Sequence, residues 1–488
     1  MIRYTRNPYV DAGVAVLELR LHKSCDQFTV DDLAAQAKEI KKEYTKRLWK
    51  SYLMVHLPNC AWTQKDLSSE KNRAYLNKVL ESYKPEFPEL ERTCAFCGRP
   101  AKVLADRRYV PMLTGETVMT SGAGGVPGLP VCGWCVFAVH FYPFATLKVE
   151  GRPLFWFAPD HLWTLRLTRI FVEKLDHILA MSSEELPKLR WPKTQLLQGA
   201  REAMAKLEDE GLSPAPPLSD ITGIHATNYG TDPNFEELHI PRGLLEFWRE
   251  AGSFPAYQEI EHRSWQTQEA KSTPRKGKKK INLGEAPEGS GAGKAEVLST
   301  EIFNLTRRNH LYEALGEAFR SDNFQEKAKL VAAQFFLRRQ GKKAAARIIE
   351  VTELFLEKVA DMERERLEAI REIADHIADH LIIGAGETRA AGQLTRRKLR
   401  LGELLQFLSY IQRKLCDAKK PLQWEKVLTA LNLQSDDDRT ASDYWLVQEL
   451  ILIRLYERLA NSSALAELPE PEEPDSTSST ESVSEKVN

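Results

Sequence analysis

Two short cysteine pairs are the residues of this chain best suited to chemistry. Four of its seven cysteines lie in Cys-x-x-Cys turns at residues 94–97 and 132–135, with 34 residues between the turns. Each turn can place two thiolates on one side of a tight bend, and four thiolates about 2.3 Å from the ion form a tetrahedral zinc site. The sequence therefore predicts a structural zinc ion, Zn²⁺, bound by Cys94, Cys97, Cys132 and Cys135.

The alternative is two unrelated cysteine pairs, one of which is redox-active. A thioredoxin-like redox motif occurs once, beside a βαβ pattern, and the sequence shows no such pattern. Zinc is therefore the favoured interpretation, with a hairpin filling the long interval between the turns. The isolated cysteines, Cys25, Cys60 and Cys416, are expected to be packing residues.

The interval between the turns also holds residues that could contact phosphate. They are Arg99, Arg107 and Arg108 after the first turn, and Gly122, Gly124 and Gly125 in a Gly/Ser/Thr-rich loop. Backbone amides of such a loop can approach phosphate closely, and basic side chains supply the attraction. The loop lacks the Lys-Ser/Thr ending of a Walker loop, so we expect contact with nucleic acid rather than a bound nucleotide. For any single residue, a solvated hairpin tip is the favoured interpretation.

Further basic clusters lie in the second half of the chain. They comprise Lys278 and Lys279 in a polar stretch, and Arg338, Arg339, Lys342, Lys343, Arg396, Arg397, Lys398 and Arg400 near expected helix ends. Several such groups along one helical bundle could form a groove that follows a phosphate backbone. Lys and Arg are also common on any exposed helix, so ordinary solvation is the alternative.

Catalytic patterns are sparse. His376 and His380, with Asp375 and Asp379, have the i, i+4 spacing that can hold a metal ion, but no third ligand is recognisable. A solvated helical face is the favoured interpretation of these four residues. No Gly-x-Ser-x-Gly motif and no kinase or helicase motif set is present. We therefore expect that the protein is not an enzyme.

Length, composition and charge limit the class of protein to which these sites belong. The chain has 488 residues, of which 42% are hydrophobic and 28% charged, so several folded domains are expected. No apolar stretch reaches the ~18–20 residues of a membrane helix, and we expect a cytoplasmic protein with no membrane contact. Residues 467–488 carry seven acids and one lysine, a charge of 1 − 7 = −6, which leaves −1 − (−6) = +5 on the remainder. A mildly basic body is compatible with nucleic-acid binding.

The elements that must position these residues indicate an α+β, helix-rich fold. Residues 1–265 are expected to form a mixed α/β domain, with helices over 30–53, 67–83, 163–181, 194–210 and 242–251. Within it, residues 91–160 are expected to form an inserted zinc-ribbon-like β module, including a hairpin that turns at Glu150 and Gly151. Residues 266–295 are expected to be a flexible basic linker or loop.

The C-terminal half has a different pattern. Residues 296–466 are expected to form an all-α helical bundle, because apolar residues recur there at helical spacing. Its longest expected helix covers 342–381, followed by helices over 395–416, 424–431 and 442–459. The acidic tail, residues 467–488, is expected to be disordered because it is rich in Pro, Glu, Ser and Thr.

The segment Thr5-Arg6-Asn7-Pro8-Tyr9-Val10-Asp11-Ala12-Gly13 and the two cysteine turns, with Cys97-Gly98-Arg99 after the first, resemble a known family. This family is the CXXC–CXXC family of CRISPR-associated proteins, the large subunit of type I-B Cascade surveillance complexes. The resemblance implies a non-catalytic protein that recognises the motif flanking a target, helps open the duplex and supports the displaced strand. Base pairing with the guide would then determine the target sequence.

The resemblance also implies partners. They are guide CRISPR RNA and target DNA, the Cascade backbone and guide-processing subunits, a separate small subunit made from the C-terminal region, and a helicase-nuclease or transposition adaptor recruited afterwards. Two alternatives remain open from the residues themselves. One is a zinc-stabilised protein-interaction scaffold without nucleic-acid contact, and the other is a metal-dependent nuclease that uses His376 and His380.

Overall fold

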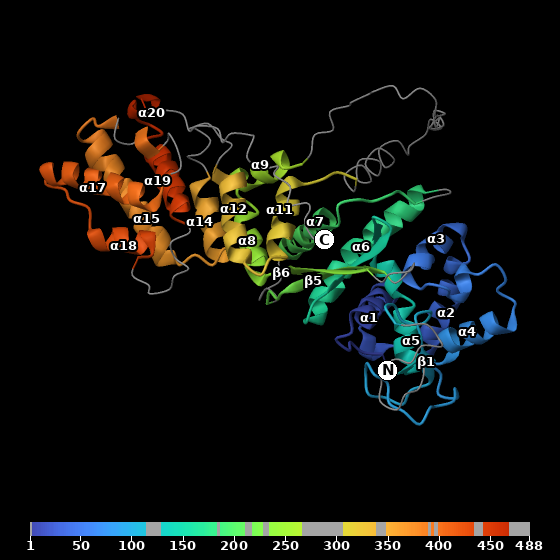
Figure 1. Cartoon of the computed structure of the whole chain (residues 1–488). Coiled ribbons are helices and arrows are strands. Elements are labelled where there is room, and N and C mark those ends of the chain that lie inside the picture. The colour runs from blue at the N-terminus through green and yellow to red at the C-terminus, as the bar shows by residue number, and fades with distance from the viewer. Residues whose placement is uncertain are drawn as a thin grey trace, which may run out of the picture. The chain divides into compact units, whose positions relative to one another are not determined.

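The computed structural model shows a helix-rich protein with two small antiparallel sheets and a helical C-terminal part, as the sequence predicts (Figure 1). The residues that it describes are 2–113, 128–182, 186–209, 217–227, 234–265, 306–337, 348–388, 392–394, 399–433 and 443–467. The expected linker, 266–295, and nearly all of the acidic tail lie outside these residues. Among the described helices, none is both long and apolar enough to cross a membrane.

The chain forms two compact units. Unit 1 comprises Met1–Leu245 and Ser264–Arg320, and unit 2 comprises Glu246–Arg263 and Ser321–Asn488. The boundary thus differs from a simple division near residue 266. Helix α11 (His310–Phe319), expected in the bundle, belongs to unit 1, because Glu313 accepts hydrogen bonds from the Thr194 N–H (3.0 Å) and hydroxyl (2.8 Å) in α7.

Unit 1 contains all of the described strands and the cysteine turns. Its helices and strands besides α11 are α1 (Pro8–Leu21), α2 (Val30–Tyr44), α3 (Arg47–His56), α4 (Glu70–Glu81), β1 (Val103–Ala105), β2 (Leu129–Val131), α5 (Gly133–Val139), β3 (Leu147–Val149), β4 (Arg152–Phe157), α6 (His161–Met181), α7 (Pro192–Asp209), β5 (Ile221–Thr227) and β6 (Asn234–Ile240). Short 3₁₀ turns, among them Tyr142–Ala145, connect some of them.

Helix α1 lies at the centre of unit 1. Asn7 caps it by accepting hydrogen bonds from the Tyr9 and Val10 N–H groups, and a proline occupies the first helical position, where a missing N–H costs nothing. Every residue from Tyr9 to Glu18 is buried. A helix that is buried on all sides shows no amphipathic stripe, so its helical period is invisible in the sequence.

The expected helix over residues 30–53 is wrong in one respect, because two helices, α2 and α3, occupy the region. The chain adopts an extended conformation at Lys46, and α3 begins at Arg47. The start of α2 agrees with the sequence, since the Thr29 hydroxyl accepts from the Asp32 N–H (3.1 Å) and the Asp32 carboxylate from the Thr29 N–H (2.9 Å).

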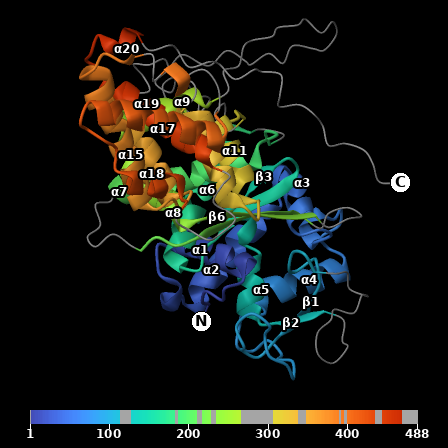
Figure 2. The same ribbon diagram turned by 60° about the vertical axis from the view of Figure 1, so that its left-hand side comes forward.

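Two glycines let α5 pack unusually close to its neighbours. A Cβ atom at Gly13 in α1 would lie 1.8 Å from the Ala138 carbonyl oxygen in α5. A Cβ atom at Gly133 would lie 1.9 Å from the Ser82 carbonyl oxygen, just after α4. Helix α5 is therefore held between α1 and the end of α4, and Figure 2 shows α5 beside α4 and near β1 and β2.

The expected β module over residues 91–160 is only partly present. Strands β1 and β2 pair as a two-stranded antiparallel sheet, but residues 133–139 and 142–145 are helical. Strands β3 and β4 belong to a different sheet, ordered β3-β4-β5-β6, whose other two strands come from residues 221–240. The apolar run of β4 contacts α1, α3, α6 and α7, which explains why it looks continuous rather than alternating.

The hairpin between β3 and β4 agrees with the sequence. Glu150 and Gly151 both have positive φ (49° and 82°), as a two-residue type I′ turn requires. Glycine adopts this conformation without cost, and a Cβ atom added at Gly151 would meet nothing within 4 Å, so the positive φ rather than crowding favours glycine here. The hairpin turn therefore fixes the register of Leu147 opposite Leu154.

Unit 2 is a helical bundle. Its elements are the end of α8 (Arg242–Ala251), α9 (Pro255–Arg263), α12 (Phe324–Val331), a π-helical segment (Ala332–Leu337), α14 (Ile349–Lys358), α15 (Arg364–His376), a second π-helical segment (Ile377–Ile383), α17 (Leu401–Asp417), α18 (Trp424–Leu431), α19 (Tyr444–Arg458) and α20 (Ala464–Glu467). Helix α19 contacts α14, α15, α17 and α18 and supplies much of the core.

The expected single helix over residues 342–381 is wrong. Helix α14 ends at Lys358, Asp361 has a positive φ of 54°, and α15 begins only at Arg364. The apolar spacing continues across the break because Val359 and Met362 in the break also point into the core. Periodicity alone therefore could not locate the interruption.

A buried ion-pair network joins the helices of unit 2. The Arg366 guanidinium donates to both oxygens of Asp443 (2.9 and 2.7 Å) and to the Ala430 carbonyl (3.0 Å). The Lys329 ammonium also contacts Asp443, at 2.6 Å. The two cations thus compensate this carboxylate for its loss of water, and Arg366 and Lys329 hold the pKa of Asp443 below its ordinary value against the effect of burial.

Candidate metal centre

The fold brings the two cysteine turns together. The sulfur atoms of Cys94, Cys97, Cys132 and Cys135 all lie within 4.8 Å of one another, and the four residues are 3, 9, 1 and 4% exposed. None of them forms a disulfide. The predicted cluster of four cysteines is therefore confirmed as a site that could bind a metal ion.

The first turn depends on a glycine. The Gly98 N–H donates to the Cys94 carbonyl (2.9 Å), and the Cys94 N–H donates to the Arg99 carbonyl (2.6 Å), so the chain closes tightly around Cys97. Gly98 has a φ of 74°, which a residue with a Cβ atom rarely adopts. These backbone hydrogen bonds place both thiols of the turn on the same side.

The second turn is the beginning of a helix. Cys132 is the N-cap residue of α5, and its sulfur accepts a hydrogen bond from the Cys135 N–H at 3.5 Å. Because α5 is held by its close contacts with α1 and α4, the second turn is fixed by the core of unit 1.

Backbone pairing joins the first turn to the second. The Ala95 N–H donates to the Pro130 carbonyl (2.9 Å) and the Lys102 N–H to the Val131 carbonyl (3.0 Å), and β1, which follows Lys102, pairs with the same strand β2. The Arg3 guanidinium donates to the Cys97 carbonyl at 2.6 Å. The N-terminal segment, the first turn and the strand before the second turn therefore form one hydrogen-bonded assembly.

The sulfur geometry fits a tetrahedral ion. A tetrahedron with ligands about 2.3 Å from its centre has edges of about 3.8 Å. The Cys97 and Cys132 sulfurs are 3.4 Å apart, and the largest separation in the cluster is below 4.8 Å. Small adjustments of the side chains would bring all four sulfurs to the distance of a zinc ion.

Electrostatics also favours a cation among these sulfurs. The Cys132, Cys135 and Cys97 thiols stabilise a thiolate at Cys94 and lower the pKa of Cys94 well below its ordinary value. Hydrogen bonding with the Cys132 and Cys94 sulfurs raises the pKa of Cys135. Four thiolates cannot be present together at these distances unless a cation compensates their charge, and a divalent metal ion does so directly.

The predicted phosphate contacts are only partly within the described residues. Arg108 is engaged in the fold, since its guanidinium pairs with Asp106 at 2.6 Å and its carbonyl accepts from the Tyr75 hydroxyl at 2.8 Å. Arg107 and Arg108 line a hollow of about 500 Å³ together with Lys71 of α4. Arg99 is half-buried at the end of the first turn.

Arg400 is the exposed N-cap residue of α17, where its N–H donates to the Glu403 carboxylate at 2.9 Å. The remaining predicted contacts lie outside the described residues. They are Gly122, Gly124, Gly125, Lys278, Lys279, Arg338, Arg339, Lys342, Lys343, Arg396, Arg397 and Lys398.

The histidines of the C-terminal half do not form a cluster of metal ligands with their acidic neighbours. His376 Nε2 lies 2.7 Å from the Lys420 carbonyl oxygen, Asp375 accepts from Arg454, and Asp379 accepts from Arg458. Within the described ranges, the four cysteines are the only group of three or more potential ligands that lie close enough together for one ion.

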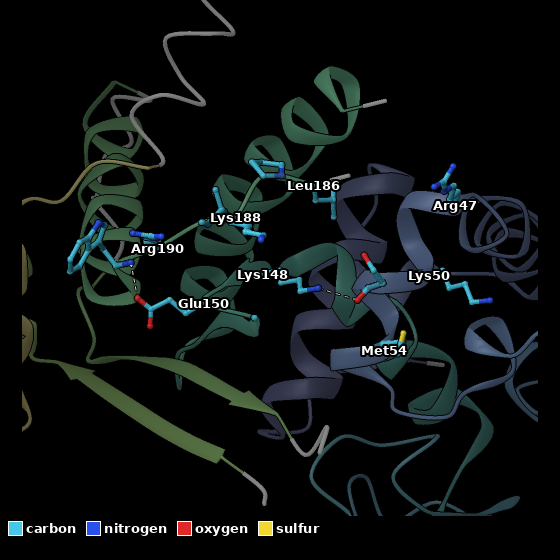
Figure 3. Close-up of a pocket in the computed structure, with 13 residues that line it drawn as sticks. Arg47, Lys50, Met54, Lys148, Glu150, Leu186, Lys188 and Arg190 are labelled. Atoms are coloured by element: carbon cyan, nitrogen blue, oxygen red, sulfur yellow. Dashed lines mark hydrogen bonds between the residues drawn. The ribbon is translucent and has the colours of Figure 1, made fainter. Parts of the chain in front are cut away.

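Sequence reasoning missed a second group of basic side chains in unit 1. Arg47, Lys50, Lys148, Lys188 and Arg190 line one hollow of about 980 Å³ (Figure 3). They come from three segments that are distant in sequence, so no local cluster of charge marks them. The hairpin turn at Glu150 was visible in the sequence, but not the fact that helix α3 and residues 186–191 lie beside it.

Comparisons with known proteins give no identification: no family model, no curated protein and no solved structure matches this chain.

Proposed function

We propose that this chain is the large, non-catalytic subunit of a type I-B CRISPR RNA-guided DNA-targeting complex, with a structural zinc ion bound by its four clustered cysteines. In this role it recognises the motif that flanks the target, helps open the duplex and supports the displaced strand. The observation that carries the proposal is the cluster of four buried cysteines packed against the N-terminal segment, because the family resemblance rests on these two parts of the sequence.

The N-terminal segment of the resemblance, residues 5–13, begins helix α1. The Asp11 carboxylate accepts hydrogen bonds from the Thr5 N–H (2.7 Å) and the Arg6 N–H (2.9 Å), which fixes the chain before the helix. Gly13 provides the close approach to α5, the helix that begins in the second cysteine turn. The two motifs therefore serve one structural purpose, which is to hold the cysteine turns against the core of unit 1.

The donor set supports a structural zinc ion rather than a catalytic one. Zinc in structural sites has four protein ligands, whereas catalytic zinc keeps one position for water or substrate. Four buried thiolates leave no such position, so the ion's contribution is to fix the chain between residues 97 and 132. This interval includes Arg99, Arg107 and the glycine-rich loop. We assign all three to contact with the flanking duplex.

Unit 2 has the features expected of a support for a strand rather than of an active site. It is a bundle of helices around α19, and the acidic neighbours of His376 and His380 are paired with arginines. In the proposed complex it lies along the displaced strand, with Arg400 among the contacts. A helicase-nuclease or a transposition adaptor is then recruited, and the guide RNA, backbone and guide-processing subunits are the permanent partners.

Reconstitution tests the proposal. The full chain is co-expressed with the backbone and guide-processing subunits of a type I-B complex and a matching guide RNA, and the purified assembly is tested for binding and opening of target duplex. We expect co-purification in a defined ratio and opening only when the flanking motif is present. A chain that joins no guide-containing assembly, or an assembly that opens duplex equally well without it, contradicts the proposal.

A pair of variants tests the assigned contact. Arg107→Glu is expected to weaken binding of the motif-bearing duplex by about fivefold or more, as the loss of one direct contact does. Arg249→Glu, an exposed arginine of α8, is the control with the same change of charge. Equal effects of the two substitutions would show that Arg107 contributes only to general charge. A protein-interaction scaffold would bind its partners without any steep dependence on salt.

A further inference from the structure

A second site lies on unit 1, in the hollow of about 980 Å³ shown in Figure 3. Its walls are helix α3, the turn between β3 and β4, and residues 186–191. Figure 3 shows its basic side chains spread across the hollow, from Arg190 on one side to Arg47 and Lys50 of α3 on the other. All of these segments belong to unit 1, so the hollow does not depend on the position of unit 2.

The charge of the hollow is strongly one-sided. Its lining includes five basic residues and one acidic residue, Glu150, whereas the whole chain balances 68 basic against 69 acidic residues. No acidic side chain among the described residues forms an ion pair with Arg47, Lys50, Lys188 or Arg190. These cations therefore remain available to an anionic ligand, and their mutual repulsion disfavours the empty state.

Lys148 lines the hollow and is held against α3. Its ammonium donates to the Ser51 carbonyl of α3 at 3.2 Å, and burial lowers the pKa of Lys148. A half-buried ammonium with a single carbonyl partner has two donor positions left to satisfy. An anionic oxygen entering the hollow would satisfy them.

The carboxylate of Glu150 does not cancel this positive charge by pairing with a cation. It accepts a hydrogen bond from the Trp191 backbone N–H at 3.3 Å, as Figure 3 shows. The Glu150 N–H in turn donates to the Leu189 carbonyl at 2.9 Å. These contacts attach residues 189–191 to the hairpin turn and shape one wall of the hollow.

Trp191 is held in an unusual conformation at the edge of the hollow. Its φ of 63° lies in the left-handed region, which a bulky residue adopts only when its surroundings impose it. The Arg308 guanidinium lies 4.6 Å from the centre of the indole ring and supports one side of the ring. The fold thus presents a fixed, partly exposed aromatic side chain next to a row of cations.

We propose that this hollow binds single-stranded nucleic acid, with phosphates held by the basic side chains and one base stacked on Trp191. Proteins that bind single strands combine a positive groove that follows the backbone with aromatic side chains that accept bases. An acidic peptide would use the cations but not the aromatic ring, so the ring favours nucleic acid. The site is independent of the proposed function, because the chain would bind an oligonucleotide here whatever complex it enters.

The first test measures binding of a fluorescent 20-nucleotide single strand to the purified full chain at several salt concentrations. Five cations predict that log K falls with log salt at a slope of about −3.5. At 0.1 M salt each phosphate contact contributes a factor of about 5, so the combination Lys50→Glu, Lys188→Glu and Arg190→Glu is expected to weaken binding about 100-fold. In this triple variant, the slope of log K against log salt is expected to become less negative by about 2.

The control changes three exposed lysines of unit 1 that lie outside the hollow. Lys41→Glu, Lys42→Glu and Lys78→Glu, in α2 and α4, produce the same change of net charge. We expect this variant to lose less than about threefold in affinity, because distant surface charges are screened. Equal losses in the two triple variants, at unchanged melting temperatures, would overturn the proposed site.

The second test examines the aromatic ring. Trp191→Ala is expected to weaken binding of single strands about fivefold or more without changing the salt slope, and Trp191→Phe to retain most of the affinity. A duplex of the same length, whose bases cannot leave the stack, should bind more weakly than the single strand. Measurements with RNA and DNA single strands of the same sequence show whether the site distinguishes ribose from deoxyribose. Displacement of the oligonucleotide by polyglutamate at equal charge concentration, or no effect of Trp191→Ala, would refute nucleic acid as the ligand.

Discussion

Removal of the metal ion from the four-cysteine site is the perturbation with the clearest expected magnitude. The ion would link residues 97 and 132, which are 35 positions apart, and so close a loop in the unfolded chain. By the loop-closure relation used for cross-links, this lowers the entropy of the unfolded chain by roughly 13 cal/mol/K, or about 4 kcal/mol at 25 °C. In unit 1, which spans about 300 residues, 4 kcal/mol corresponds to a fall in melting temperature of roughly 6 °C.

The structure also indicates which elements lose stability when the metal ion is removed. Strands β1 and β2 pair over only three residues each, and a two-stranded sheet of this size is marginal by itself. Helix α5 is held separately by α1 and α4, so the core of unit 1 should survive chelation. We therefore expect faster amide hydrogen exchange over residues 94–105 and 129–132, with little change in α1.

Calorimetry of the full chain, with zinc and with excess chelator, measures the effect. The substitutions Cys94→Ser and Cys132→Ser together should give the chelated melting temperature under both conditions. Cys416→Ser, which changes an exposed cysteine away from the site, is the matched control and should behave like the unchanged protein. Identical melting temperatures with and without chelator, together with less than about half a metal ion per chain, would refute a structural ion.

Three further outcomes follow from the packing. Gly133→Ala should destabilise unit 1 by several kcal/mol in urea unfolding, because the added Cβ atom would meet the Ser82 backbone. The control is Gly402→Ala, at an open helical position, which should stabilise unit 2 by up to about 1 kcal/mol. Asp443→Ala should lower the unfolding free energy of unit 2 by roughly 3–5 kcal/mol because it leaves the buried Arg366 guanidinium without a carboxylate, although Lys329 keeps its ion pair with Glu326; a loss below about 1 kcal/mol would contradict the network. Burial lowers the pKa of His140 from 6.5 to about 4, so the unfolded state takes up this proton first, and the contribution of His140 to stability should fall by about 3 kcal/mol as the pH drops from 6.5 to 4. His140→Gln should show a smaller fall in the same pH range, measured by thermal unfolding.

Helix caps, tight turns and some helix limits could be predicted well from the sequence. The cap at Thr29, the turn at Glu150 and Gly151 and the limits of α8 and α18 agree with the structure. Each depends on side chains or dihedral preferences within about four positions, so the sequence contains all of the relevant interactions. The breaks between α2 and α3 and between α14 and α15 were missed because apolar spacing continues through both.

The arrangement of the sheets could not be predicted in the same way. The sequence places β3 and β4 next to the cysteine turns, but their sheet is completed by β5 and β6, more than 60 residues further along. Pairing over such distances is decided by which apolar faces fit together, and a short window of sequence does not contain that information. The basic hollow arises in the same way, from α3, the β3–β4 turn and residues 186–191.

The sequence by itself determined the ligand types of the metal centre, because two Cys-x-x-Cys turns supply four thiolates whatever surrounds them. Tertiary structure alone decided that the four sulfurs meet, through the pairing of β1 with β2 and the close contacts at Gly13 and Gly133. It also decided that five dispersed cations and Trp191 share one hollow. The physical reason is that residue chemistry is local, whereas proximity between distant segments depends on how the whole core packs.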